Sequence, residues 1–284
     1  MYDFSIGVLL DSFRTNIESA LKKAEEVGAT GIQVSANYGE LAPENLTSSR
    51  KKEFLDRVKS HGLTISALCG DLGCGFGSAE KNPDLIERSK RILDLAKELE
   101  TNIVTTHIGV VPSNPGHERY KIMQDACSKL CRYADNVKAH FAIETGPEIA
   151  VVLKDFLDSL NSKGVAVNLD PANFVMVTGD DPVQAVYTLK DYIVHTHAKD
   201  GRRLLVKDPE VVYGLIEDEI QAGQSFIELP LGQGDVDFKN YIKALDDIGY
   251  HGFLTIEREV GDNSETDIKM AVDFLRNQIN KTKG

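Results

Sequence analysis

The chain of 284 residues carries 32 Lys and Arg against 44 Asp and Glu, a formal net charge of −12 at pH 7. This balance argues against a nucleic-acid partner, because surfaces that bind nucleic acid cluster Lys and Arg to neutralise phosphates. No apolar stretch approaches the roughly 20 residues that a membrane helix needs, and the start, MYDFSIGVLLDSF, lacks the basic segment of a signal peptide. We therefore expect a cytoplasmic protein with no membrane partner.

An amphipathic helix, a glycine or short polar break and an apolar strand recur in this order along the chain. Copies of this unit cover residues 17–36, 52–68, 87–109, 155–170, 187–200 and 241–257. Glycines such as Gly28 stand where a helix needs a left-handed residue to end. Apolar runs complete a set of eight candidate strands near Ser5, Ile32, Ile65, Val104, Ala142, Val167, Val194 and Leu254. Eight such units predict an α/β fold, a (β/α)8 TIM barrel, as a single domain over residues 1–284.

Two loops that follow predicted strands are candidates for the rim of an active site, because loops after strands form that rim in such barrels. Residues 70–77 hold four glycines, whose spacing matches neither a dinucleotide fingerprint nor a P-loop. This spacing favours a mobile active-site loop over a phosphate-binding one. The second loop, residues 201–237, has room for a short helix at 211–223.

Four apolar runs each end in a side chain that is able to bind a metal. They are FAIETG with Glu144, VAVNLDPAN with Asp170, IVHTHAKD with His197 and FLTIERE with Glu257. A buried carboxylate is costly unless it is paired, and the carboxyl ends of barrel strands converge on one mouth. We therefore predict that these four residues bind one divalent metal ion. Three carboxylates and one imidazole suit Mn²⁺, Mg²⁺ or Co²⁺, with Zn²⁺ as an alternative.

In two of these motifs, two residues that could bind a metal lie two positions apart. They share one face of the strand, and their depth in the barrel predicts which of them is the ligand. His195 and His197 share the inward face, but His195 lies deeper and is expected to be a hydrogen-bonded residue rather than a ligand. Glu259 shares a face with Glu257 but lies farther out, at the rim. His107, which ends the fourth predicted strand, is open to two interpretations, an ordinary rim residue or a contact to substrate or metal.

The four motifs, in this order and with the stretch LGQGDVDF before the last, resemble the xylose-isomerase-like barrels, which include sugar isomerases and ketose 3-epimerases. The resemblance covers essentially the whole chain. It implies that Glu144, Asp170, His197 and Glu257 hold the metal. It also implies that Glu144 and Glu257 are the catalytic residues, each of which moves a proton.

The same resemblance implies substrate contacts for His107, Glu148, Asn173 and Arg203, with Arg202 adjacent to the last. Asn173 departs from those relatives that carry a histidine there, although it keeps a hydrogen-bonding group. For Glu148 the residues themselves leave a second interpretation open, an exposed acid that favours the start of a helix.

The expected function is that of a divalent-metal-dependent isomerase or epimerase. It would act on a small-molecule sugar or sugar phosphate through an enediolate, with proton transfer by two glutamates. Three alternatives are a lyase similar to inosose dehydratase, a non-catalytic sugar-binding barrel and an abasic-site endonuclease. Asn173 and Arg202, where the nuclease pattern favours histidine, and the negative net charge disfavour the nuclease. The resemblance leaves a homodimer or a homotetramer open.

Overall fold

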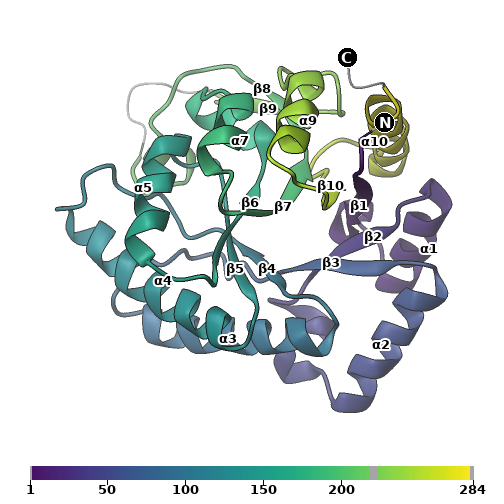
Figure 1. Cartoon of the computed structure of the whole chain (residues 1–284), viewed down its shortest axis with the longest axis horizontal. Helices are drawn as coiled ribbons and strands as arrows, with labels where there is room; N and C mark the ends of the chain where they lie inside the picture. Colours follow the sequence, from purple (N-terminus) through teal and green to yellow (C-terminus); the bar gives the residue numbers. More distant parts are fainter. Residues whose placement is uncertain (1, 218–222, 282–284) are drawn as a thin grey trace.

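The structure, a computed structural model, describes residues 2–217 and 223–281. Its centre is a closed barrel of parallel strands in the order β1-β10-β7-β6-β5-β4-β3-β2 (Figure 1). They are β1 (Ser5–Leu9), β2 (Gly31–Ser35), β3 (Thr64–Cys69), β4 (Ile103–Thr106), β5 (His140–Glu144), β6 (Val165–Leu169), β7 (Ile193–Ala198) and β10 (Phe253–Ile256). The barrel closes where β1 pairs with both β10 and β2. The predicted (β/α)8 fold is confirmed, and each of the eight candidate strands lies in the barrel.

Helices surround this barrel and cover the outward face of its strands (Figure 1). The longer ones are α1 (Ile17–Val27), α2 (Ser48–Ser60), α3 (Asn82–Glu98), α4 (Glu118–Asn136), α5 (Ala150–Leu160), α7 (Pro182–Leu189), α9 (Phe238–Asp247) and α10 (Ser264–Ile279). The shorter ones are η1 (Leu10–Phe13), η2 (Gly39–Leu41), η3 (Pro43–Asn45), α6 (Pro171–Asn173), η4 (Phe174–Thr178) and α8 (Pro209–Val212). Within the described residues no helix is both long and apolar enough to cross a membrane.

Local chemistry fixes the ends of these helices. The Asn16 side chain accepts a hydrogen bond from the Ser19 amide and begins α1. Gly28 then ends this helix in the left-handed conformation that the sequence predicts, at a φ of 78°. Leu21 and Ala24 lie on its buried face, so the amphipathic pattern packs α1 against the strands.

The connection between β7 and β10 contains a two-stranded antiparallel sheet that the sequence analysis took for a loop. This sheet pairs β8 (Asp200–Arg203) with β9 (Phe226–Leu229). The buried Asp200 carboxylate holds the following turn by accepting hydrogen bonds from the backbone amides of Gly201, Gly232, Gly234 and Val236. Of the short helix expected at 211–223, α8 covers the first residues, and 218–222 lie outside the described part of the chain.

A layer of polar side chains fills the barrel interior next to its mouth, the end where the strands finish. The layer consists of Gln33, Ser66, Thr105, Asn168, His195 and Thr255, all buried. Because buried polar groups are costly without partners, each is hydrogen-bonded within the layer or to the backbone. Two residues of this layer, Asn168 and Gln33, hydrogen-bond to Glu144 and His197 at the mouth.

Candidate metal centre

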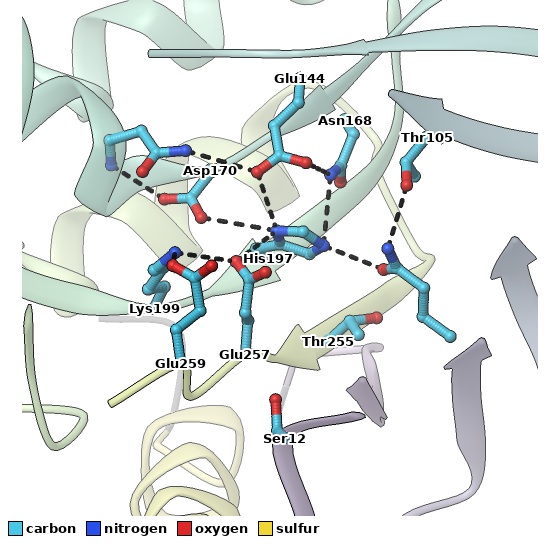
Figure 2. A network of polar contacts seen from close by, with 12 residues as sticks. Ser12, Thr105, Glu144, Asn168, Asp170, His197, Lys199, Thr255, Glu257 and Glu259 are labelled. Atoms are coloured by element: carbon cyan, nitrogen blue, oxygen red, sulfur yellow. Dashed lines mark hydrogen bonds and ion pairs between the residues drawn. The ribbon is translucent and has the colours of Figure 1, made fainter. Parts of the chain in front are cut away.

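The four predicted ligands meet at the mouth of the barrel. One ligand atom from each of Glu144, Asp170, His197 and Glu257 lies within 4.8 Å of the others. Metal–oxygen and metal–nitrogen bonds of about 2.0–2.2 Å place ligand atoms at most about 4.4 Å apart, so this spacing is close to that of a metal shell. Figure 2 shows Glu144 on one side of the His197 ring and Glu257 on the other.

The His197 ring is oriented with one nitrogen toward the three carboxylates. Its Nδ1 lies 3.4 Å from Glu144 Oε1, 3.4 Å from Asp170 Oδ2 and 3.1 Å from Glu257 Oε2. Its Nε2 donates to Gln33 Oε1 at 2.9 Å, while the Gln33 amide nitrogen donates to Thr105. With the proton on Nε2, the lone pair of Nδ1 is directed at the centre of the cluster, as in histidines that bind metals.

Two buried atoms of the cluster test whether a cation fits there. Asp170 Oδ2 and His197 Nδ1 are both buried, and neither has a hydrogen-bond partner among the described residues. Unpaired buried polar atoms of this kind are costly and point to a missing partner. A divalent cation satisfies both atoms at once, and the hard oxygen ligands match Mn²⁺, Mg²⁺ or Co²⁺. The residues therefore fit the metal that the sequence predicts.

Neighbouring residues set the charge of this cluster. Burial lowers the pKa of His197, but the carboxylates of Glu257 and Glu144 outweigh burial and raise it well above its usual value. The metal-free cluster therefore favours a second proton on the imidazole, at Nδ1, in the place that a cation would take. Since this proton competes with a cation, metal affinity is expected to fall as the pH is lowered.

Lys199 is a residue of this centre that the sequence analysis missed. Its ammonium lies 3.2 Å from Glu257 Oε2 and also pairs with Glu259, and its side chain is only 5% exposed. The partners fix the Glu257 carboxylate in place and keep it ionised, because burial raises its pKa less than Lys199 and His197 lower it. Lys199 follows His197 by two residues, so the strand repeat that selects His197 also directs Lys199 inward.

Asn168 is a second residue that the sequence analysis passed over. Its amide nitrogen donates to Glu144 Oε2 at 3.0 Å, and its carbonyl accepts from His195 Nδ1 at 2.8 Å. His195 in turn contacts Thr255 at 2.9 Å and does not belong to the group of four ligands. Burial, with His197 nearby, lowers the pKa of His195 well below its usual value, so it stays neutral.

Two of the four predicted substrate contacts line the cavity above the metal cluster, which has a volume of about 380 Å³. His107 lies with Nδ1 3.2 Å from Asp71 and Nε2 3.6 Å from Glu144. Burial lowers its pKa, but Glu144 and Asp71 outweigh burial and raise it to about 9. Asn173 donates to Glu144 Oε1 at 3.4 Å and to the Thr145 carbonyl at 3.2 Å.

The other two predicted substrate contacts lie outside that cavity. Glu148 and Arg203 line a neighbouring cavity of about 600 Å³, and neither lines the one above the cluster. Arg202 points away from both and pairs with Asp235 at the surface. Glu148 is not the exposed helix-start acid of the second interpretation, because only 6% of it is exposed.

The burial of Glu148 gives a testable dependence of stability on pH. Burial raises its pKa to about 8, whereas an unfolded glutamate titrates near pH 4.3. The folded protein therefore holds a proton that the unfolded chain has lost, so this residue makes stability fall as the pH rises from about 4.3 to 8. We expect Glu148→Gln to reduce that fall in urea unfolding of the metal-free protein. Glu80→Gln, at an exposed residue, is the control. The same slope of unfolding free energy against pH in Glu148→Gln, Glu80→Gln and the wild type would contradict this prediction.

A model of the xylose isomerase-like TIM barrel family matches residues 21–278, most of the chain. The chain belongs to this family. The resemblance predicted from the four motifs is thus confirmed, and the match includes all four candidate ligands.

Three proteins similar to this chain are 17–23% identical to it. An inosose dehydratase of Clostridium beijerinckii is 23% identical over 146 residues, 50% of this chain and 48% of that protein, so the match spans about half of that relative. The structure of the probable 3-DHS dehydratase AsbF from Bacillus anthracis has a TM-score of 0.75 at 20% identity, covering 96% of this chain and 99% of that one. An L-ribulose 3-epimerase structure has a TM-score of 0.74 at 17% identity, covering 97% and 94%. These structures share the fold.

Proposed function

We propose that this protein is a divalent-metal-dependent isomerase or epimerase of a sugar or sugar phosphate. The observation that carries the proposal is the convergence of Glu144, Asp170, His197 and Glu257, two of which present unpaired buried atoms to a common centre. The ketose epimerases among the structures with the same fold are consistent with this activity. The cavity above the cluster provides room for a small polyol.

The two glutamates are proposed as the proton-transfer pair. A proton on the carbon next to a ketone is weakly acidic, and a bound cation would stabilise the negative charge that develops on the oxygens when it leaves. Glu144 and Glu257 flank the His197 ring from opposite sides (Figure 2). One carboxylate takes the proton from one face of the substrate, and the other returns a proton from the opposite face. Removal from a stereogenic carbon beside the ketone and return to that carbon from the other face gives an epimer. Removal from the terminal carbon and return to the former ketone carbon gives an aldose.

Three further side chains are suited to assist. His107 and Asn173 line the cavity and both contact Glu144, so we propose that they hold substrate hydroxyl groups next to this base. Lys199 holds Glu257, and we propose it as a positioning residue for the second glutamate. Each catalytic carboxylate thus has its own polar support, which fixes its direction.

Dehydration is a second candidate reaction. The curated relatives include inosose dehydratases, and the structures with the same fold include a probable dehydratase. The first step, removal of a proton beside a ketone by one glutamate, is common to both reactions. The outcomes differ in the product, because a dehydratase releases water and leaves a carbon–carbon double bond that absorbs ultraviolet light.

A substrate screen tests the proposal. The protein is stripped with EDTA, reloaded with Mn²⁺ and incubated with ketoses, ketose phosphates and inososes. We expect an epimer or aldose, identified by NMR, that forms only in the reloaded protein. An ultraviolet-absorbing product from an inosose would support the dehydratase instead. Equal conversion by the stripped and reloaded protein would contradict a role for the metal.

A further inference from the structure

A second cavity opens beside the metal centre on the same end of the barrel. It has a volume of about 600 Å³ and is formed by β8 and by the segments that follow β4, β5, β6 and β8. Val110 and Val177 line both this cavity and the one above the metal cluster, so the two share a wall. We call it the outer cavity. Its size lies within the usual range of about 300–1,000 Å³ for small-molecule sites.

Two polar side chains of the outer cavity are only partly satisfied within the protein: one buried carboxyl oxygen lacks a hydrogen bond, and one guanidinium lacks an ion pair. Glu148 is 6% exposed; its Oε2 accepts from the Val111 amide at 3.3 Å, but Oε1 has no hydrogen-bond partner in the part of the chain that the structure describes. Arg203 donates from Nη1 to the Thr178 carbonyl at 2.8 Å, and no described carboxylate forms an ion pair with it. Both groups thus retain capacity for a ligand.

The remaining charges of this cavity are largely satisfied within the protein. Arg119 pairs with Glu210, Asp208 accepts from the Glu210 amide, and Lys207 has an interaction partner. Arg203 thus remains as a single described cation of this lining without a carboxylate partner, and Glu148, whose pKa burial raises to about 8, adds little negative charge near pH 7. A phosphate group carries close to two negative charges and is usually held by more than one such cation, which this lining lacks. An uncharged group with hydroxyls fits better, because hydroxyls both donate and accept.

Between these polar groups the walls are apolar. Val110, Pro112, Pro147, Val152 and Val177 contribute to them. The cavity therefore offers apolar walls together with hydrogen-bond donors and acceptors. A sugar ring has the matching surface, because it presents apolar C–H faces and a rim of hydroxyl groups. We propose that the outer cavity binds a second, uncharged sugar unit, so that the substrate is a glycoside-like molecule rather than a single ketose. That the ketose end of this substrate reacts at the metal centre rests on the proposed function. The sugar site in the outer cavity does not depend on it.

The first experiment tests the site without metal or catalysis. Methyl α-D-glucopyranoside is titrated into the EDTA-treated protein, and valine methyl signals are followed by NMR. We expect saturable shifts at Val110, Val152 and Val177, and their loss in Arg203→Met. Arg202→Met is the matched control, because the adjacent Arg202 pairs with Asp235 outside this cavity. Shifts confined to other valines, or equal shifts in Arg203→Met and Arg202→Met, would overturn the site.

The second experiment asks what the ketose carries. Three ketoses that differ only at carbon 6, and cannot close a six-membered ring, are compared by calorimetry with the Mn²⁺-loaded protein: 6-deoxy-D-fructose, D-fructose 6-phosphate and isomaltulose, which bears glucose there. We expect isomaltulose to bind at least about tenfold more tightly than 6-deoxyfructose, the usual worth of hydrogen bonds to charged groups. That ratio should approach one in Arg203→Met and persist in Arg202→Met.

Each outcome of the second experiment shows whether the outer cavity binds a sugar, a phosphate or neither. Preference for the phosphate, lost in Arg203→Met, would replace the sugar site by a phosphate site. Equal affinity for all three ketoses, or no binding, would overturn the extended substrate. Glucoside shifts in the outer cavity without turnover of any ketose would leave the sugar site standing and count against the proposed function alone.

Discussion

Replacing Glu144 or Glu257 by glutamine is expected to lower turnover by about 10²–10⁴-fold, the usual worth of general acid–base catalysis. Glutamine keeps the side-chain shape and one oxygen for a metal but is not a base. Because both residues belong to the cluster of four ligands, metal affinity should fall as well. Turnover is therefore measured at saturating Mn²⁺, with bound metal quantified in the same sample.

The exposed Glu80, far along the chain from either residue, provides the matched control. Glu80→Gln should keep both turnover and metal. A Glu144→Gln or Glu257→Gln protein that holds its metal and retains wild-type turnover would remove that residue from the proton-transfer pair. We also expect a single glutamine variant to exchange a substrate proton on one face without forming epimer, since its remaining glutamate removes and returns the same proton.

The second large effect is expected at His197. His197→Gln should lose most Mn²⁺ binding, more than the roughly 10–100-fold that changes to the residues supporting ligands usually cost. His195→Gln should retain the metal, because His195 bonds Asn168 and Thr255 and lies outside the four-residue cluster. Titration with Mn²⁺, followed by electron paramagnetic resonance, measures both affinities.

His195→Gln is a closely matched control for His197→Gln, because the two histidines share a strand face and lie two residues apart. Equal losses of affinity in His195→Gln and His197→Gln would show that the cluster does not bind the metal as assigned. A circular dichroism melting curve for each variant separates loss of a ligand from loss of the fold, because His195 is bonded within the polar layer of the barrel interior.

The barrel could be predicted from the sequence because each strand is a short apolar run that follows an amphipathic helix. The convergence of the four candidate ligands could be predicted because the carboxyl ends of parallel strands meet, which turns residues distant in sequence into neighbours. The strand repeat also separated His197 from His195. The same step of two residues, taken once more from His197 within IVHTHAKD, leads to Lys199.

Other features depend on tertiary contacts that no local pattern reveals. Gln33 and Asn168 stand within apolar strand runs, and only the closed barrel brings them to His197 and Glu144. The sheet of β8 and β9 depends on Asp200, whose carboxylate accepts hydrogen bonds from backbone amides more than thirty positions away in the sequence. The separation of Glu148 and Arg203 from the cavity above the metal cluster depends on how four connecting segments fold against one another.

The most direct test of the central claim, proton transfer by a pair of glutamates at a metal centre, is solvent exchange. The Mn²⁺-loaded protein is given a substrate from the screen in D₂O, and the product and the recovered substrate are examined by NMR and mass spectrometry. We predict deuterium on the carbon beside the ketone, acquired only when the metal is present, because a carboxylate exchanges its proton with solvent. Product formed at the full rate without solvent deuterium would contradict the account and indicate direct hydride transfer instead.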